Sequence, residues 1–97
     1  MLNYRHLYYF WVVSKEGGFA RAAERLDMAV QTISAQVREL ERALGHQLLK
    51  PSGRGVAMTE AGHAAFARAE EIFQLGQLIP EEVREAASGK VARLAVG

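Results

Sequence analysis

Four polar side chains between residues 31 and 38 have the types and the spacing to form hydrogen bonds with DNA. They are Gln31, Thr32, Ser34 and Arg38. On a helix they lie opposite an apolar stripe whose members follow one another by four, three and four residues: Ile33, Val37, Leu40 and Leu44. A helix with a short, polar and basic outer face suits the major groove of duplex DNA. An ordinary amphipathic helix with a solvated face is the alternative.

Gln31 is the strongest candidate for contacting a base. Residues in the first turns of a recognition helix reach deepest into the groove. Gln31 is long and can both donate and accept, so it suits a paired contact with adenine, whereas Ala29 and Ala35 have no side-chain hydrogen-bonding group and Val30 could touch only a thymine methyl. The alternative is a solvated glutamine on the flank of the helix.

A shorter helix must hold this one in place. Residues 19–26 are strong helix formers, and their larger side chains recur at helical spacing. Only residues 27–29 separate the two helices. Helices joined by so short a turn cross steeply, so residues 19–44 predict a helix-turn-helix. A plain pair of helices is the alternative.

The segment from about residue 47 to residue 58 predicts a β-hairpin. Two short extended runs flank a turn at residues 51–55 that is rich in Pro and Gly. Arg54 lies between two glycines in this turn. The turn is either a wing whose arginine reaches a narrow minor groove, which has a strongly negative potential, or a plain solvated loop.

Helices are also predicted at both ends of this region. Asn3 can cap a first helix that ends near Lys15, and Thr59 can cap a long last helix that Pro80 bends or restarts. The last helix is too apolar to stand alone, so we predict that it forms a dimer interface, although a partner within the domain could also cover it. The side chains concerned are Phe66, Ile72, Phe73, Leu75, Leu78 and Ile79.

Residues 90–97 have the pattern of a strand with no sheet to join. They are expected to begin a further domain, or to be a frayed tail. The charge of the chain is uneven: residues 1–58 carry eight Lys/Arg against five Asp/Glu, and residues 59–97 carry four against six. The basic half contains the helix-turn-helix, as a phosphate-facing surface requires.

Nothing in the sequence indicates an enzyme. The chain has no cysteine, and its three histidines are scattered singly, without carboxylates at metal-site spacing. No apolar run approaches the roughly 20 residues of a membrane span, and the N-terminus lacks a signal-peptide layout, so we expect a cytoplasmic protein with no cofactor in these residues. The rival to DNA binding is a helical dimerisation module, because the last helix would suffice for it.

These segments together resemble the N-terminal part of LysR-type bacterial transcriptional regulators. The order of helix, helix-turn-helix, winged hairpin, long helix and strand is similar, and the matching positions cover most of residues 3–62. They lie in segments 7–10, 18–26, 33–37, 40–41, 44–45, 48–49 and 59–62. Segments 8–13 and 31–36 look especially like the sodium/proton antiporter regulator branch of the family.

The resemblance implies a mainly α fold. A winged helix-turn-helix DNA-binding domain with a two-stranded hairpin would occupy residues 1–58, a linker and dimerisation helix residues 59–88, and the start of a missing effector-binding domain residues 89–97. Such a protein regulates transcription by binding an interrupted palindrome in double-stranded DNA as a homodimer, or as a tetramer at full length, and responds to a small-molecule or ion effector. The DNA contacts carried over by matching position are Arg21, Gln31, Thr32, Ser34, Arg38 and Arg54.

Four positions depart from the pattern of the family. Its recognition helix usually begins with Ser or Thr followed by Gln or Pro, where this chain has Ala29 and Val30. Alanine also replaces a frequent Arg or Lys at Ala35 and a frequent Thr or Ser at Ala20. The missing N-cap hydroxyl should cost about 1 kcal/mol of helix stability unless Asp27 replaces it. The fold therefore carries over better than the individual base contacts.

Overall fold

The computed structural model describes residues 2–89, in which five helices and a two-stranded antiparallel sheet are found. The elements are α1 (Tyr4–Glu16), α2 (Phe19–Leu26), α3 (Val30–Leu44), β1 (Leu49–Ser52), β2 (Gly55–Met58), α4 (Glu60–Gly76) and α5 (Ile79–Ala87). The mainly α, winged helix-turn-helix arrangement is as predicted. The strand expected in residues 90–97 lies outside the described residues.

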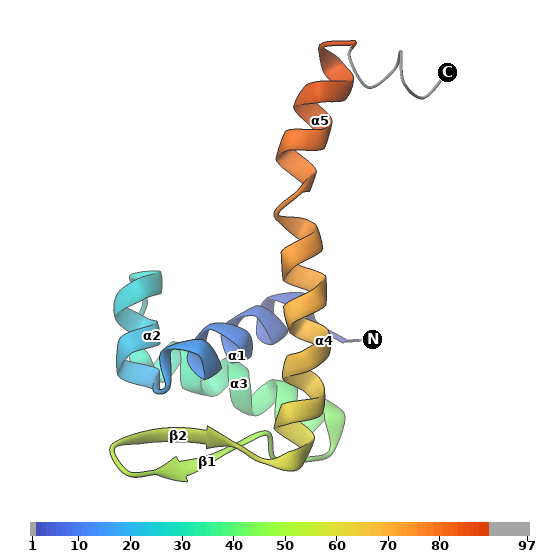
Figure 1. Ribbon diagram of the computed structural model, residues 1–97. Coiled ribbons are helices and arrows are strands. Elements are labelled where there is room, and N and C mark those ends of the chain that lie inside the picture. Colours follow the sequence, from blue (N-terminus) through green and yellow to red (C-terminus); the bar gives the residue numbers. More distant parts are fainter. Residues whose placement is uncertain (1, 90–97) are drawn as a thin grey trace.

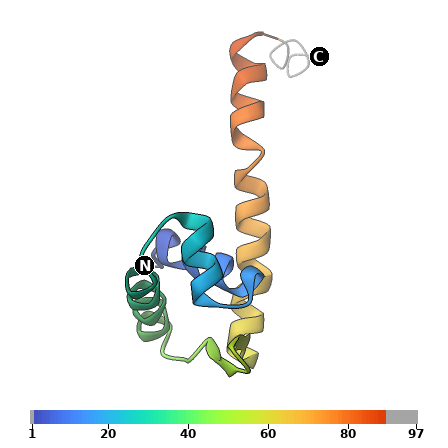
Figure 2. The ribbon, with the colours of Figure 1, turned by 90° about the vertical axis from the view of Figure 1, so that its left-hand side faces the viewer.

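The molecule is an α-helical domain attached to a rod. Figure 1 shows α1, α2, α3 and the hairpin on one side of α4 and α5, which together form the rod (residues 60–87), and Figure 2 shows the same division from the side. The radius of gyration is 16.8 Å, compared with about 13 Å for a compact domain of this length. No helix within residues 2–89 is long and apolar enough to cross a membrane.

The core lies between α1, α2 and α3 and continues to β1 and α4. Ile33, Val37 and Leu40 of the predicted stripe are fully buried there. The other large, fully buried side chains come from α1 and from the residue before β1: Phe10, Val12, Val13 and Leu48. One prediction from spacing was wrong, because Leu44 is 41% exposed. It is the last residue of α3 and lies beyond the end of the core that the other three apolar residues of the stripe enter.

The turn between α2 and α3 is closed by a left-handed residue. Asp27 has φ 54° and its N–H donates to the carbonyls of Ala23 and Glu24, which ends α2. Aspartate adopts this conformation more readily than most residues. Asp27 therefore does not replace the missing cap of α3, whose N-cap residue Ala29 forms no side-chain hydrogen bond.

The hairpin begins two residues later than predicted, and its turn is tighter. Leu49 pairs with Met58 at one end, and Ser52 pairs with Gly55 at the other, so only residues 53–54 remain in the turn. Pro51, which the prediction assigned to the turn, is tolerated in β1 because a two-stranded sheet leaves one edge of each strand unpaired. Arg54 lies at the tip, as expected.

A close backbone contact fixes the hairpin against the turn between α1 and α2. The N–H of Val56 donates to the carbonyl of Gly17 at 3.0 Å. A Cβ at Gly55 would lie 2.1 Å from that same carbonyl oxygen, so only glycine fits there. The wing is thus attached to the helical domain and does not extend freely from it.

The rod is broken once. α4 ends at Gly76 and α5 begins at Ile79, with Pro80 in its first turn. Proline has no N–H, and its ring clashes with the carbonyl four residues earlier, which here belongs to Gly76. α4 therefore ends at Gly76, whose carbonyl cannot accept a hydrogen bond from Pro80. A new helix, α5, then begins with Pro80 in its first turn, which is one of the two outcomes predicted for this proline.

Candidate nucleic-acid interface

The outer face of α3 is polar and open to solvent. Gln31, Thr32 and Arg38 are exposed, and Ser34 is half-buried, while Ile33 and Val37 are 0% and 2% exposed on the opposite side. The helical periodicity thus separates the two faces as predicted. Because Ala29 provides no side-chain cap, the first N–H groups of α3 also have no side-chain partner, and helix N-termini of this kind attract phosphate.

A shallow hollow separates α3 from the hairpin. It has a volume of about 250 Å³ and is lined by Phe19, Ser34, Val37, Arg38, Glu41, Gln47, Leu49, Lys50, Pro51 and Val56. Two predicted site residues, Ser34 and Arg38, thus share one surface with a cation from β1. Lys50 was not predicted as a site residue, although a Lys beside the buried Leu49 on a hairpin strand must point away from the core.

The six cations of α2, α3 and the hairpin differ in their ion pairs. Within residues 2–89, Arg25 pairs with Glu16, Arg42 with Glu39, and Arg68 with Glu71. No ion pair in this part of the chain involves the other four cations of α2, α3 and the hairpin, which are Arg21, Arg38, Lys50 and Arg54. Their charges are therefore available to neutralise phosphates.

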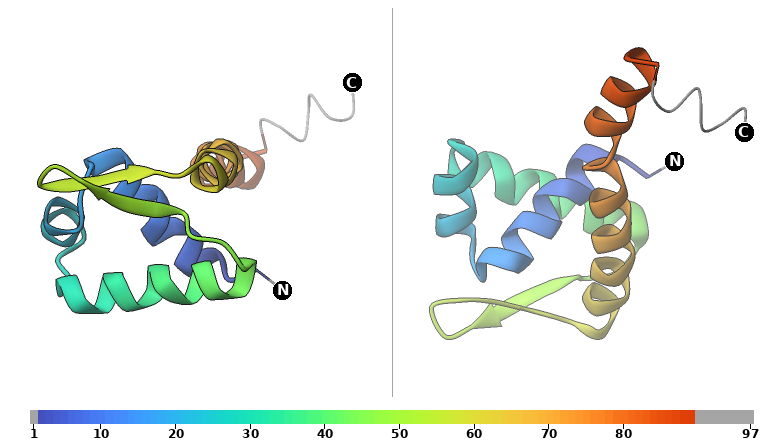
Figure 3. Two further views of the ribbon diagram at one scale, coloured as in Figure 1. Left: turned by 90° about the horizontal axis from the view of Figure 1, so that it is seen from below. Right: turned by 45° about the horizontal axis from the view of Figure 1, so that its top comes forward.

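These cations come from elements that meet at one end of the domain. Figure 3 shows α2, the start of α3 and the tip of the hairpin together at the end farthest from the rod. The tip carries Arg54 and α2 carries Arg21. Gln31 and Thr32 lie in the first turn of α3, and Ser34 and Arg38 lie further along the helix toward the rod. Of the six predicted residues, Ser34 and Arg38 share the hollow, and the other four lie on elements that meet at the end of the domain farthest from the rod.

Glu41 links α3 to the hairpin. Its Oε2 accepts hydrogen bonds from the backbone N–H groups of Leu48 and Leu49, at 2.7 and 3.2 Å. These bonds satisfy two donors at the start of β1 that the hairpin ladder leaves free. Sequence reasoning missed this role because Glu41 reads as one more charge on a solvated helix face.

Replacing Glu41 with alanine is expected to destabilise the protein by about 1.5–3 kcal/mol, because two part-buried N–H groups lose a charged acceptor. Glu41→Gln should lose less, since its amide oxygen can still accept. Glu39→Ala is the matched control: its carboxylate is 52% exposed and, among the described residues, pairs only with Arg42 on the same helix, so about 0–1 kcal/mol is expected. Chemical denaturation measures all three, and equal losses for Glu41→Ala and Glu39→Ala would contradict the role of Glu41.

The apolar residues predicted for a dimer interface fall into two groups. Phe66, Ile72 and Phe73 are half-buried and pack against the core of their own chain. Leu75, Leu78 and Ile79 are 66%, 51% and 57% exposed. Val83, four residues after Ile79 and 59% exposed, extends the second group and was not predicted.

The fold and this surface define a winged helix-turn-helix domain carried on a helical rod. Comparison with known proteins identifies the family to which this domain belongs. Residues 4–63 match the family of bacterial regulatory helix-turn-helix proteins of the lysR type. The chain belongs to this LysR family, as its sequence patterns predicted. It is 46% identical over 76 residues, or 78% of its length, to the transcriptional activator protein NhaR of Escherichia coli K12.

Solved structures of the family agree with the fold. The DNA-binding domain of BenM in complex with benA site 1 DNA has a TM-score of 0.82 and 34% identity, over 90% of this chain and 98% of that one. The CbnR DNA-binding domain in complex with DNA has a TM-score of 0.76 and 39% identity, over 88% of this chain and 98% of that one. The relatives are regulators and not enzymes. The chain spans only 25% of the length of NhaR.

Proposed function

We propose that this protein is a sequence-specific transcriptional regulator that binds duplex DNA through α3 and the hairpin. The observation that carries the proposal is the hollow between α3 and the hairpin, where Ser34 lies beside Arg38 and Lys50, two cations that have no ion pair within residues 2–89. Two similar domains, those of BenM and CbnR, have been solved with DNA. In this proposal the protein acts in the bacterial cytoplasm, where its DNA target lies.

The proposed roles of the side chains follow from their reach and charge. Gln31 contacts a base in the major groove, where a paired hydrogen bond with adenine would discriminate by about 1–3 kcal/mol. Thr32 and Ser34 are short and serve base or phosphate. Arg21 and Arg38 contact phosphates, together with Lys50. Arg54 at the hairpin tip reaches the minor groove beside the site.

The second part of the proposal is a homodimer formed through the rod. The exposed apolar residues Leu75, Leu78, Ile79 and Val83 would be covered by a second copy of the chain. Two copies related by a two-fold axis bind two inverted half-sites, which gives an interrupted palindrome. The expected effector-binding domain after residue 88, its small-molecule or ion effector and a tetramer of the full-length protein stay predictions from the family resemblance.

The test of DNA binding is its dependence on salt. Arg38→Gln removes one proposed phosphate contact, so the slope of log affinity against log salt concentration should become shallower by about 1. Arg68→Gln removes the same charge from the rod, where Arg68 is 80% exposed and pairs with Glu71, and should leave the slope unchanged. Fluorescence anisotropy with a labelled duplex measures both. Equal slopes for wild type and Arg38→Gln would remove Arg38 from the site, and wild-type affinity that does not vary with salt would contradict the whole proposal.

A further inference from the structure

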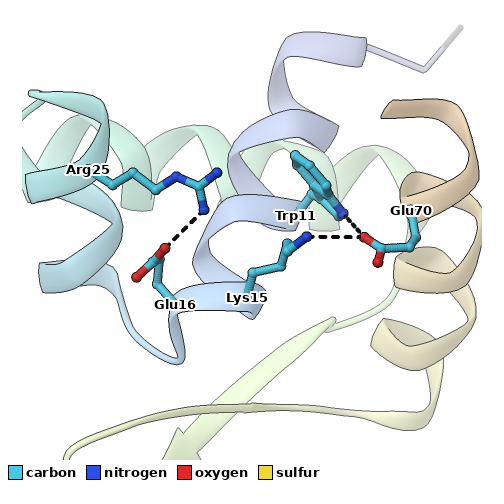
Figure 4. Close-up of polar contacts among 5 residues, drawn as sticks. All are labelled: Trp11, Lys15, Glu16, Arg25 and Glu70. Carbon is cyan, nitrogen blue, oxygen red and sulfur yellow. Dashed lines mark hydrogen bonds and ion pairs between the residues drawn. The ribbon is translucent and has the colours of Figure 1, made fainter. Parts of the chain in front are cut away.

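The position of the rod relative to the DNA-binding domain depends on a small joint between α1 and α4. Figure 4 shows the indole of Trp11 and the ammonium of Lys15 directed at the carboxylate of Glu70. Trp11 Nε1 donates to Glu70 Oε1 at 2.5 Å, and Lys15 Nζ lies 3.6 Å from the same oxygen. Lys15 Nζ also lies 4.5 Å from the centre of the Trp11 ring. Two side chains of α1 thus converge on one carboxylate oxygen of Glu70.

The rest of the joint is apolar. The Phe73 ring lies one helical turn beyond Glu70 and contacts Trp11 and Tyr8, with ring centres 5.1 and 5.3 Å apart. Trp11 is only 3% exposed. Aromatic contacts of this kind tolerate sliding and tilting, whereas a hydrogen bond to a carboxylate is directional. Glu70 therefore adds a directional restraint between α1 and the middle of α4, while the hydrogen bonds of Thr59 hold the start of α4.

Beyond this joint the rod has little other support. Every residue from Gln74 to Ser88 is exposed, so α5 has no buried side chain. Any rotation at the joint is therefore transmitted along the rod to the residues proposed to meet the second chain. Val83 lies 13 residues beyond Glu70, or roughly 20 Å at the rise of a helix.

A small tilt at the joint displaces the far end of the rod by about the spacing of one base pair in DNA. A tilt of about 10° over roughly 20 Å moves the far end by about 3.5 Å, close to the 3.4 Å rise of one base pair. In a two-fold dimer both arms tilt, which doubles the change in the distance between the two α3 helices. A stiff joint would therefore accept one spacing of half-sites and resist spacings that differ by one base pair.

We propose that Glu70, held by Trp11 and Lys15, is a positioning residue that sets the spacing of half-sites this protein recognises. The inference rests on the proposed dimeric binding of DNA. Glu70 does not touch DNA in this proposal. It acts by restraining the direction in which α4 leaves the winged helix-turn-helix domain. Loss of its carboxylate leaves apolar packing as the restraint between α1 and α4 at this level, because the hydrogen bonds of Thr59 hold only the start of α4.

The test measures affinity across a series of spacers. Wild-type protein first selects its preferred half-site from random duplexes, and two inverted copies of that half-site are then separated by spacers that differ by single base pairs. We expect Glu70→Ala to reduce the preference for the best spacer over its neighbours by about tenfold, the equivalent of one hydrogen bond to a charged group. Glu70→Gln retains an acceptor for Trp11 Nε1 and should restore most of the preference. Binding to a single half-site should not change in either variant.

Two controls separate the joint from general stability. Glu71→Ala alters the adjacent carboxylate, which is 62% exposed and within residues 2–89 pairs only with Arg68 on the same helix, and should keep the wild-type spacer preference. Trp11→Phe keeps an aromatic ring beside Phe73 but removes the N–H donor, so it should relax spacing as Glu70→Ala does. Trp11 is the only tryptophan of the chain, and its fluorescence reports the altered joint in Glu70→Ala and not in Glu71→Ala.

The outcomes distinguish the inference from the function on which it rests. A wild-type protein that selects one spacer, with Glu70→Ala and Trp11→Phe equally selective, would overturn the role of Glu70 alone. A wild-type protein with no spacer preference would overturn dimeric recognition and this inference with it. Relaxed spacing in both variants, with rescue by Glu70→Gln, is the expected result.

Discussion

Replacing Gly62 with alanine is expected to lower the free energy of unfolding by about 3 kcal/mol, because the added methyl group has no room. A Cβ at Gly62 would lie 2.0 Å from the carbonyl oxygen of Leu48 and 3.2 Å from Cβ of Met58. The nearest atom belongs to the backbone, so no side-chain rotation can relieve the overlap. Either α4 or the segment before β1 must move.

The contact at Gly62 is part of a larger junction between α4 and the start of the hairpin. Thr59 Oγ1 accepts from the N–H of Gly62 at 3.0 Å and donates to the carbonyl of Gln47 at 2.6 Å. The N–H of Thr59 donates to the carbonyl of Leu48 at 3.0 Å. Moving α4 away from residue 48 therefore breaks hydrogen bonds that join the rod to the wing.

Gly76→Ala is the matched control for Gly62→Ala, because both glycines belong to α4. A Cβ at Gly76 meets no atom within 4 Å, and its φ is not in the left-handed region. Alanine is a better helix former than glycine by about 1 kcal/mol in a helix interior, so Gly76→Ala should be neutral or slightly stabilising. Thermal unfolding followed by circular dichroism compares the two. Equal melting temperatures for Gly62→Ala and wild type would show that the junction is looser than its geometry implies.

Local periodicity was enough to predict the helix-turn-helix and the order of the elements. Residues such as Ile33 and Val37 recur at helical spacing, and only one packing direction buries them. The caps at Asn3 and Thr59 were also found from the sequence, and both side chains accept backbone N–H groups as expected. These features depend on residues close together in the chain.

Contacts between distant residues could not be predicted in the same way. In the sequence Gly62 is an ordinary helix residue, and only the structure shows that Leu48 lies against it. Phe73 has the pattern of an interface residue, and only the structure shows that Trp11 covers one side of its ring. The sequence left two partners open for the apolar face of the last helix. The structure assigns Phe73 to the core of its own chain and leaves Leu75 exposed.

The sequence predicted the separate parts of the candidate site but not how they fit together. Polar residues at helical spacing identified the outer face of α3, and a Gly-rich turn identified the hairpin tip. The hollow between them brings Lys50 beside Arg38, a pairing that requires the docking of β1 on the end of α3 through Glu41. No pattern in either segment alone indicates that docking.

Replacing Leu75 with aspartate is expected to convert the proposed dimer into monomers and to weaken binding to a two-half-site duplex by about 10²–10⁴-fold, because the second half-site is then no longer bound intramolecularly. Leu75 is 66% exposed in the single chain, so the change removes no contact of its core. In the dimer each buried leucine contributes roughly 1.5–3 kcal/mol, and two-fold symmetry makes every substitution count twice. The new carboxylates would also be buried without a partner, which adds to the loss.

Gln77→Asp serves as the control for Leu75→Asp, since it places the same charge at an exposed polar position of the rod, in the break between α4 and α5. Analytical ultracentrifugation should show monomers for Leu75→Asp and dimers for Gln77→Asp. Affinity for a duplex with a single half-site should be the same in both, because α3 and the hairpin are unchanged. A dimeric Leu75→Asp protein would place the interface elsewhere on the chain. A monomeric variant that still binds the two-half-site duplex as tightly as wild type would instead show that each domain binds its half-site independently, because the rod then contributes nothing to recognition.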